Sequence, residues 1–375
     1  MTVFVLEDSS KHWLGGGQQV TLEVLEALRG RCRTIVCDMA RRSGFLDRAS
    51  KAGFEVRFLY GFGALGGKFR QSYNLGVAEL LCLPPLTLWN LFVFLRWRYR
   101  LALGPRDIIL YAATKKTFFL AWWLSLFGCR KLIFHAHTVE DSRSIIDSLF
   151  KALLRRADII LAVSTAVRRR LPVPHIELLP NPCSLAPRRP LEARALPLGR
   201  PLVAAVVASL IPIKGIEDFI VSWRFLSSHG KDILRYHIYG TGPMERSLRR
   251  TASELGPDCP VAFKGFIPFE ELAEGIDILV QPSIVPEACG MSVVEAFCSA
   301  IPVIVTDLGG QSELAENGHC GILIPPRSPE ALAGALERLA SSPDEYHRLS
   351  RNGLAASAAH HPDLFRRRFN AIVLS

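Results

Sequence analysis

The sequence lacks several features that would place it in a specialised class of protein. Its nine cysteines form no C-x-x-C pair, and their odd number and scattered spacing predict reduced thiols rather than a disulfide framework or a zinc site. It has no run of about 20 apolar residues, which a membrane span needs. The first residues also lack a basic stretch followed by an apolar one, so we expect a strand there and a cytoplasmic protein.

Charged residues are sparse, at 21%, whereas hydrophobic residues make up 49% of the 375 residues. This composition is typical of a globular protein, and the length suggests two to three domains. The net charge of +10 favours anionic partners such as nucleic acid, lipid headgroups or phosphorylated small molecules. Charge alone does not choose among these three classes.

Short apolar runs alternate with helical patterns, which predicts parallel sheets covered by helices on both faces. Seven prolines between residues 171 and 201 exclude a helix or a central strand there, so we expect a hinge between two α/β halves. Open sheets of this class bind ligands at the carboxyl ends of their strands. The predicted strands are residues 3–6, 34–37, 56–60, 108–111, 132–135 and 159–163 before the hinge, and 202–208, 236–239, 261–263, 278–281 and 302–306 after it. The predicted helices are residues 18–29, 115–127, 144–155, 215–228, 244–254, 269–274, 292–299, 329–341 and 363–373.

Residues 75–103 are unusually apolar and aromatic, and they end in the basic run at 96–100. Their densest apolar part, 80–95, is too short for a membrane span and contains two prolines. A core helix and an interfacial helix remain as alternatives. Trp, Phe and Leu beside an arginine cluster suit the headgroup region of an anionic membrane, so the segment predicts a peripheral membrane contact.

A glycine-rich stretch at 61–66 matches G-x-G-x-x-G and follows a predicted strand, which suggests a dinucleotide site. The signal is weak, because the stretch follows a later strand and has only Glu79 as an acidic partner about 20 residues on. A flexible loop is the simpler interpretation. Lys68 and Arg70 beside it are candidates for contact with a phosphorylated acceptor.

Residues 282–310 carry the strongest pattern for chemistry. Gly290 permits a tight backbone turn after a predicted strand, and Ser292 is a candidate helix cap or first-turn residue. The free N–H groups of a helix start suit phosphate or sugar oxygens. Glu295, expected in the first turn, is suited to accept hydrogen bonds from a ribose diol, and Glu287 faces the same opening. Each glutamate alone also fits an ordinary capped helix.

This segment resembles the E-x7-E motif of the large retaining glycosyltransferase family 4. The resemblance implies the GT-B fold, an α/β architecture of two Rossmann-like domains that face each other across a cleft. It covers most of the chain and is more specific in the second half. Matching stretches follow in the family's order: Gly15-Gly16-Gly17-Gln18, His135-Ala136-His137, residues 157–164, Leu179-Pro180-Asn181-Pro182, residues 210–215, 238–243 and 263–266, and Asp307-Leu308-Gly309-Gly310 with Glu313.

The resemblance implies a nucleotide-diphosphate sugar bound mainly by the second domain, without a metal. Glu295 would hold the ribose, and Glu287 with the backbone of Cys289, Gly290, Met291 and Ser292 would hold the transferred sugar and the phosphates. Lys214 would neutralise the diphosphate. Gly15, Gly16 and Gly17 would approach the same phosphates, His137 would lie near the donor sugar, and Phe266 would belong to the donor site.

The chain departs from the family pattern at Ser209, which stands where the family often has an arginine. Ser209 offers one neutral hydrogen bond to the diphosphate, worth about 0.5–1.5 kcal/mol, where a charged donor contributes about 1.5–3 kcal/mol. Three alternatives to a transferase stay open, of which the missing arginine supports only the scaffold. They are a sugar-nucleotide epimerase of the same architecture, a nicotinamide-dependent oxidoreductase and a non-catalytic scaffold.

The expected organisation is an acceptor-binding domain at 1–185, a donor-binding domain at 186–355, and a last helix at 356–375 that crosses back to the first domain. The resemblance, with the apolar and basic segment at 75–103, predicts transfer of a sugar to a lipid-linked saccharide, or to a lipopolysaccharide or exopolysaccharide acceptor. The protein would work on the inner face of the cell membrane and would not bind nucleic acid.

Overall fold

The computed structural model describes residues 1–9, 16–38, 43–59, 77–138, 145–171, 173–185, 192–256 and 259–375, without the side chains of 77–87, 145–146 and 317. These residues form two compact units. The first comprises Met1–Val163, Arg168–Leu179 and Phe365–Ser375, and the second comprises Ser164–Val167 and Pro180–Leu364. Within the described part of the chain, no helix combines the length and the apolar character needed to cross a membrane.

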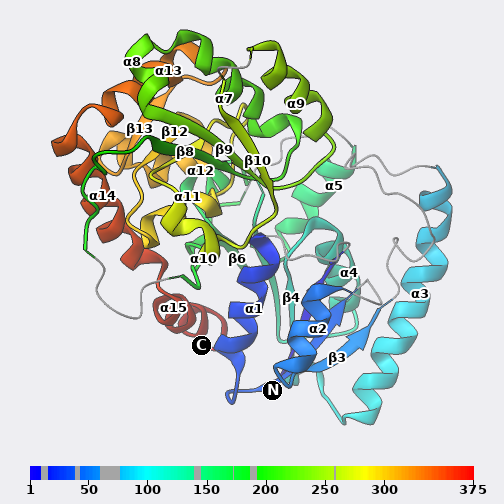
Figure 1. The fold of residues 1–375 in the computed structure, drawn as a ribbon. Coiled ribbons are helices and arrows are strands. Elements are labelled where there is room, and N and C mark those ends of the chain that lie inside the picture. The colour runs from blue at the N-terminus through cyan, green and yellow to red at the C-terminus, as the bar shows by residue number, and fades with distance from the viewer. Residues whose placement is uncertain are drawn as a thin grey trace. The chain divides into compact units, whose positions relative to one another are not determined.

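The first unit is built on a parallel sheet in the order β3-β2-β1-β4-β5-β6-β7. Figure 1 labels β3, β4 and β6 of this sheet and the helices α1 to α5 and α15. The core lies between this sheet and its helices, and the last helix packs into it through Phe365, Phe369 and Val373. The strands are β1 (Thr2–Glu7), β2 (Arg33–Asp38), β3 (Glu55–Phe58), β4 (Ile108–Ala112), β5 (Lys131–Ala136), β6 (Ile159–Ala162) and β7 (Glu177–Leu178). The helices are α1 (Gly16–Leu28), α2 (Gly44–Lys51), α3 (Val77–Arg100), α4 (Lys115–Ser125), α5 (Ile145–Leu154) and α15 (Pro362–Val373).

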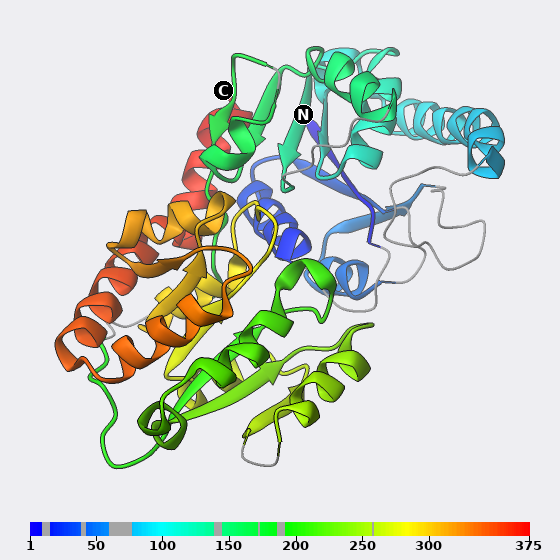
Figure 2. The same ribbon diagram turned by 90° about the horizontal axis from the view of Figure 1, so that it is seen from above.

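The second unit is a parallel sheet in the order β10-β9-β8-β11-β12-β13, with helices on both faces (Figure 2). Successive residues of β8 show why: Ala204 packs with α7 and α13, whereas Ala205 packs with α10 and α11. The strands are β8 (Leu202–Val207), β9 (Leu234–Tyr239), β10 (Val261–Gly265), β11 (Ile278–Gln281), β12 (Val303–Thr306) and β13 (Gly321–Ile324). The helices are α6 (Thr165–Arg168), α7 (Ile216–Ser222), α8 (Ser228–Ile233), α9 (Glu245–Glu254), α10 (Phe269–Leu272), α11 (Met291–Cys298), α12 (Gly309–Leu314), α13 (Pro329–Ala340) and α14 (Pro343–Ala356).

The predicted architecture of two parallel α/β sheets is confirmed, with strand ends within about two residues. Two strands and several helices were not predicted. β7 has only two residues and both are exposed, so no apolar pattern marks it. α14 contains Gly353, which a helix pattern disfavours. The structure gives the reason for that glycine, because a Cβ there would lie 2.6 Å from Phe297 of α11.

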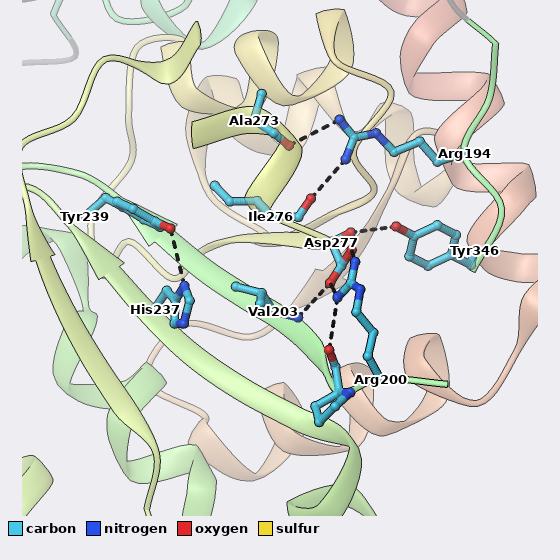
Figure 3. Close-up of polar contacts among 10 residues, drawn as sticks. Arg194, Arg200, Val203, His237, Tyr239, Ala273, Ile276, Asp277 and Tyr346 are labelled. Atoms are coloured by element: carbon cyan, nitrogen blue, oxygen red, sulfur yellow. Dashed lines mark hydrogen bonds and ion pairs between the residues drawn. The ribbon is translucent and has the colours of Figure 1, made fainter. Parts of the chain in front are cut away.

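The amino edge of the second sheet is held by a buried carboxylate, Asp277, immediately before β11. Arg200 donates two hydrogen bonds to it, of 2.7 and 2.8 Å, and the Val203 amide donates a third of 2.8 Å (Figure 3). Its carbonyl accepts a hydrogen bond from the Tyr346 hydroxyl of α14. Arg194 donates to the carbonyls of Ile276 and Ala273. These bonds hold residues 194–203, which lead into β8, against the segment before β11.

Candidate functional site

The carboxyl edge of the second sheet carries a turn, residues 282–290, that two neighbouring loops hold in place. Gly215 has φ 61°, and a Cβ there would lie 1.9 Å from the Pro282 carbonyl oxygen. On the other side, the Gly310 amide donates to the Glu287 carbonyl at 2.7 Å, and a Cβ on Gly309 would meet that same oxygen at 2.6 Å. Only glycine permits both close approaches, so three loops that are distant in sequence form one surface.

Lys214 and Glu287 meet on this surface. The Lys214 ammonium donates to Glu287 Oε2 at 2.8 Å, and Ser283 donates to the other carboxylate oxygen. The Lys214 side chain is 22% exposed and that of Glu287 is 14% exposed. The two residues therefore form a partly open ion pair whose ammonium retains donor capacity toward a bound anion.

Helix α11 begins directly after this turn. Its N-cap is Gly290 at φ 90°, which has no side chain to cap the first N–H groups. Ser292 is the second helical residue and donates to Gln281 at 3.0 Å, so it does not cap the helix. Gln281 in turn donates to Gln311 at 2.8 Å. These two buried glutamines were not singled out from the sequence, because only the fold brings them beneath the helix start.

Glu295 was predicted in the first turn of the helix, and this is wrong. The helix starts at Met291, which places Glu295 in the second turn, where the dipole favours a carboxylate less. Burial has the largest effect on this carboxyl group and raises the pKa of Glu295 to about 8. Cys183 and Glu270 raise the pKa by smaller amounts. The carboxyl group is therefore largely protonated at neutral pH when no ligand is bound.

Other predicted donor-site residues of the second unit differ widely in exposure. Ser209 is exposed after β8, and Phe266 is 64% exposed after β10. Cys289 is buried, and burial raises the pKa of its thiol to about 12, so it is no nucleophile at neutral pH. Met291 accepts a 3.6 Å contact from the buried Asn181 amide.

Three predicted site residues of the first unit, Gly16, Gly17 and His137, lie at the carboxyl edge of its sheet. Gly16 and Gly17 are the first two residues of α1, and a Cβ on Gly17 would lie 3.9 Å from the His137 ring. Gly15, Lys68 and Arg70, with the glycine-rich stretch at 61–66, lie outside the described residues.

His137 follows β5, and the centre of its ring lies 4.0 Å from that of the His135 ring, with the two planes tilted by 43°. The Nδ1 atom of His135 is 2.7 Å from the Tyr111 hydroxyl. Both ring nitrogens of His137 are buried and have no hydrogen-bond partner among the described residues. Burial lowers the pKa of His137 to about 4, so the ring is neutral at physiological pH. A neutral imidazole offers one donor and one acceptor, which suits sugar hydroxyl groups.

Across the described ranges, no group of three or more His, Cys, Asp or Glu side chains is placed to hold a metal ion.

Two family models together match almost the whole chain. Residues 14–186 match the model described as Glycosyltransferase Family 4, and residues 189–355 match the model described as Glycosyl transferases group 1. The chain belongs to glycosyltransferase family 4, with the GT-B fold. The predicted family and fold are confirmed.

Curated relatives match about half of this chain. WcaL of Salmonella typhimurium, assigned as a colanic acid biosynthesis glycosyltransferase, is 29% identical over 218 residues, covering 54% of this chain and 53% of WcaL. Alpha-D-kanosaminyltransferase of Streptomyces kanamyceticus is 31% identical over 164 residues, which cover 43% of this chain and 42% of that protein. The matched part of the chain thus spans about half the length of these curated relatives.

Solved structures match over their full length. Anabaena HepE in complex with UDP and glucose has a TM-score of 0.78 at 19% identity and covers 100% of this chain and 99% of HepE. The lipopolysaccharide outer core galactosyltransferase WaaB has a TM-score of 0.75 at 16% identity, and the match covers 100% of this chain and 99% of WaaB. At these identities the likeness establishes the fold alone.

Proposed function

We propose that this protein transfers a sugar from a nucleotide-diphosphate sugar to a hydroxyl group of a glycan acceptor, with retention of configuration at the anomeric carbon. The observation that carries the proposal is the partly open Lys214–Glu287 pair beside the uncapped start of α11. A cation and free helix N–H groups at one sheet edge suit a diphosphate. UDP bound to HepE, of the same fold, supports a nucleotide sugar as the donor.

In this reaction Lys214 stabilises the negative charge that develops on the leaving diphosphate. Glu287 lies 2.8 Å from Lys214, so it holds the ammonium in place and accepts hydrogen bonds from the transferred sugar. The acceptor hydroxyl attacks from the face that the nucleotide leaves, and the departing phosphate accepts its proton. Attack on the same face of the sugar retains the configuration of the anomeric carbon and needs no second carboxylate on the opposite face.

Glu295 binds the ribose hydroxyls as a carboxylate, and Phe266 offers its exposed ring to the nucleobase. The diol donates two hydrogen bonds to the ionised form, so nucleotide binding favours loss of the proton from Glu295. In the first unit, the neutral His137 ring offers one donor and one acceptor to a sugar hydroxyl group.

We further propose a lipid-linked saccharide, or a lipopolysaccharide or exopolysaccharide precursor, as the acceptor at an anionic membrane surface. Helix α3 packs inward through Phe94, whose ring meets Phe4 at 5.4 Å, and lies along the periphery of the first unit (Figures 1 and 2). Its opposite face exposes an apolar and basic stripe, which suits a headgroup region. The stripe consists of Leu88, Trp89, Phe92, Leu95, Arg96, Tyr99 and Arg100.

A panel of UDP-, GDP- and ADP-sugars tests the donor proposal. A bound donor at 100 times its dissociation constant adds about 2.7 kcal/mol of stability, which a thermal-shift assay detects. Incubation with the stabilising donor and a glycolipid acceptor, followed by NMR of the product anomer, tests transfer and retention. An epimerised donor would identify an epimerase, and no binding to any sugar nucleotide would overturn the proposal in favour of a scaffold.

Sedimentation with liposomes tests the membrane contact. Wild-type protein should sediment with anionic vesicles at low salt and be released by added salt, whereas a Trp89→Ser/Phe92→Ser variant should stay in the supernatant. Equal sedimentation of both proteins would contradict a role for α3.

A further inference from the structure

Three aromatic side chains are in contact one after another near the carboxyl ends of β4 and β5. Tyr111 of β4 belongs to the core of the first unit, and both it and His135 of β5 are fully buried. The Tyr111 hydroxyl lies 2.7 Å from His135 Nδ1, and the centre of the His135 ring lies 4.0 Å from that of His137. These contacts connect the core to the ring that we propose for a sugar hydroxyl group.

The direction of the hydrogen bond between Tyr111 and His135 follows from the partners that each atom has. Burial lowers the pKa of His135 well below its ordinary value, with a smaller effect from His137, so its ring is neutral and carries one hydrogen. If that hydrogen were on Nδ1 and donated to Tyr111, the phenol hydrogen would be buried without an acceptor among the described residues. Burial also raises the pKa of Tyr111 well above its ordinary value, so the phenol keeps its hydrogen. Tyr111 therefore donates to Nδ1, and His135 carries its hydrogen on Nε2.

His137 has no comparable anchor in the described part of the chain. Neither of its ring nitrogens has a hydrogen-bond partner there, and its described ring contact is with His135. Gly17 leaves space beside it, because even a Cβ at that position would lie 3.9 Å from the His137 ring. An imidazole turns easily about χ2, which exchanges the ring nitrogen and carbon atoms that face a ligand. The orientation of His137 thus depends on His135, and that of His135 depends on Tyr111.

We propose that Tyr111 and His135 are positioning residues for the transferred sugar. The Tyr111 hydroxyl fixes the tautomer and the orientation of His135, whose ring holds the His137 nitrogens toward a sugar hydroxyl group. Three ring nitrogens support a ligand here, because His135 Nε2 and both nitrogens of His137 are buried without a described partner, which is costly unless a ligand bonds to them. The inference rests on the proposed function for the sugar, whereas the hydrogen-bond direction does not.

Proton–nitrogen correlation NMR of the full-length protein, labelled at histidine and free of ligand, tests the positioning. His135 should carry its hydrogen on Nε2, and Tyr111→Phe should shift its Nδ1 resonance and change the ring signals of His137. The matched control is Tyr236→Phe, because Tyr236 is also fully buried and bonds Ser222 at 2.9 Å in the second unit. It should leave both histidines unchanged. A hydrogen on Nδ1 of His135, or the same histidine signals in Tyr111→Phe as in wild type, would overturn the proposal.

Calorimetric titration connects the three rings to the sugar. The probes are UDP-glucose, GDP-mannose and ADP-glucose, each compared with its free nucleotide. Tyr111→Phe should weaken binding of the sugar nucleotide about fivefold, as expected for one hydrogen bond to the sugar, and leave binding of the free nucleotide unchanged. A merely structural role would weaken both or neither, and either result would refute the positioning role.

A double-mutant cycle tests whether Tyr111 acts through His137. In a His137→Ala protein, Tyr111→Phe should cause no further loss of affinity for the sugar nucleotide, because the ring that it positions is gone. Losses that add up would contradict this path. If none of the three sugar nucleotides binds, the proposed function fails, and the NMR comparison decides the tautomer of His135 and the hold on His137 without it.

Discussion

Two ion pairs lie at opposite edges of the same six-stranded sheet. At the amino edge, Asp277 accepts two hydrogen bonds from Arg200 and one from the Val203 amide, and its side chain is 4% exposed. At the carboxyl edge, Glu287 accepts from Lys214 and Ser283 and is partly open to solvent. Both are short carboxylate–cation contacts, yet their surroundings differ.

The difference separates a structural pair from one suited to a ligand. The planar guanidinium of Arg200 and a backbone amide occupy both oxygens of Asp277 from directions that the fold fixes. The Lys214 ammonium makes one described contact and can donate to a second acceptor. A diphosphate can therefore accept a hydrogen bond from Lys214 without disrupting the fold. A ligand at Asp277 would have to displace Arg200 or the Val203 amide, whose hydrogen bonds hold the segment that leads into β8.

The largest expected effect comes from breaking the structural pair. Asp277→Ala removes the acceptor of the Val203 amide and of two hydrogen bonds from Arg200, and it should lower the free energy of unfolding by about 3 kcal/mol. Glu254→Ala, which removes an exposed pair with Arg250, should change it by less than about 0.5 kcal/mol. Chemical denaturation of both variants measures the contrast, and equal losses would contradict the structural role of Asp277.

Breaking the open pair should affect the reaction and not the fold. Lys214→Ala should cost about 1.5–3 kcal/mol of transition-state stabilisation, a fall of about 10- to 150-fold in kcat/KM. The free energy of unfolding should change by about 1 kcal/mol or less, because Lys214 is partly exposed. Initial rates with a donor found in the panel measure this, and a wild-type rate would remove Lys214 from the proposed site.

The raised pKa of Glu295 makes the stability of the protein depend on pH. Its pKa is raised from 4.5 to about 8 in the folded protein, so the native state holds the proton more tightly than the unfolded state. This contribution to stability is fully present below pH 4.5 and is lost as pH rises through 8. Between pH 6 and pH 8, wild-type protein should therefore lose about 2 kcal/mol relative to Glu295→Gln. Parallel pH-dependent slopes in the two proteins would show that Glu295 does not titrate there.

The smallest effect concerns Ser209, where the family often carries an arginine. Ser209→Arg adds a charged donor beside the proposed diphosphate and should tighten nucleotide binding by about 1 kcal/mol, roughly fivefold. Calorimetric titration with the nucleotide that stabilises the protein measures the change. Unchanged affinity would place Ser209 away from the diphosphate.

The sequence pattern predicted both sheets because parallel strands, buried on both faces, appear as short apolar runs between helical patterns. It did not predict β7 or α14, because an exposed two-residue strand and a helix with an internal glycine have little local signal. Within the site, spacing predicted Glu287, Gly290 and Glu295 as neighbours. It placed Glu295 in the first turn, but the helix starts at Met291, one residue before the predicted start at 292, so Glu295 lies in the second turn.

The family, the two α/β halves and the order of the glycine and glutamate motifs follow from the amino-acid sequence, since these depend on local pattern and spacing. Only the tertiary structure decided that Lys214 meets Glu287, because 73 residues separate them and the approach depends on a glycine that passes close to the Pro282 carbonyl. Only burial, a property of the packed chain, decided that Glu295 and His137 are both largely neutral at pH 7.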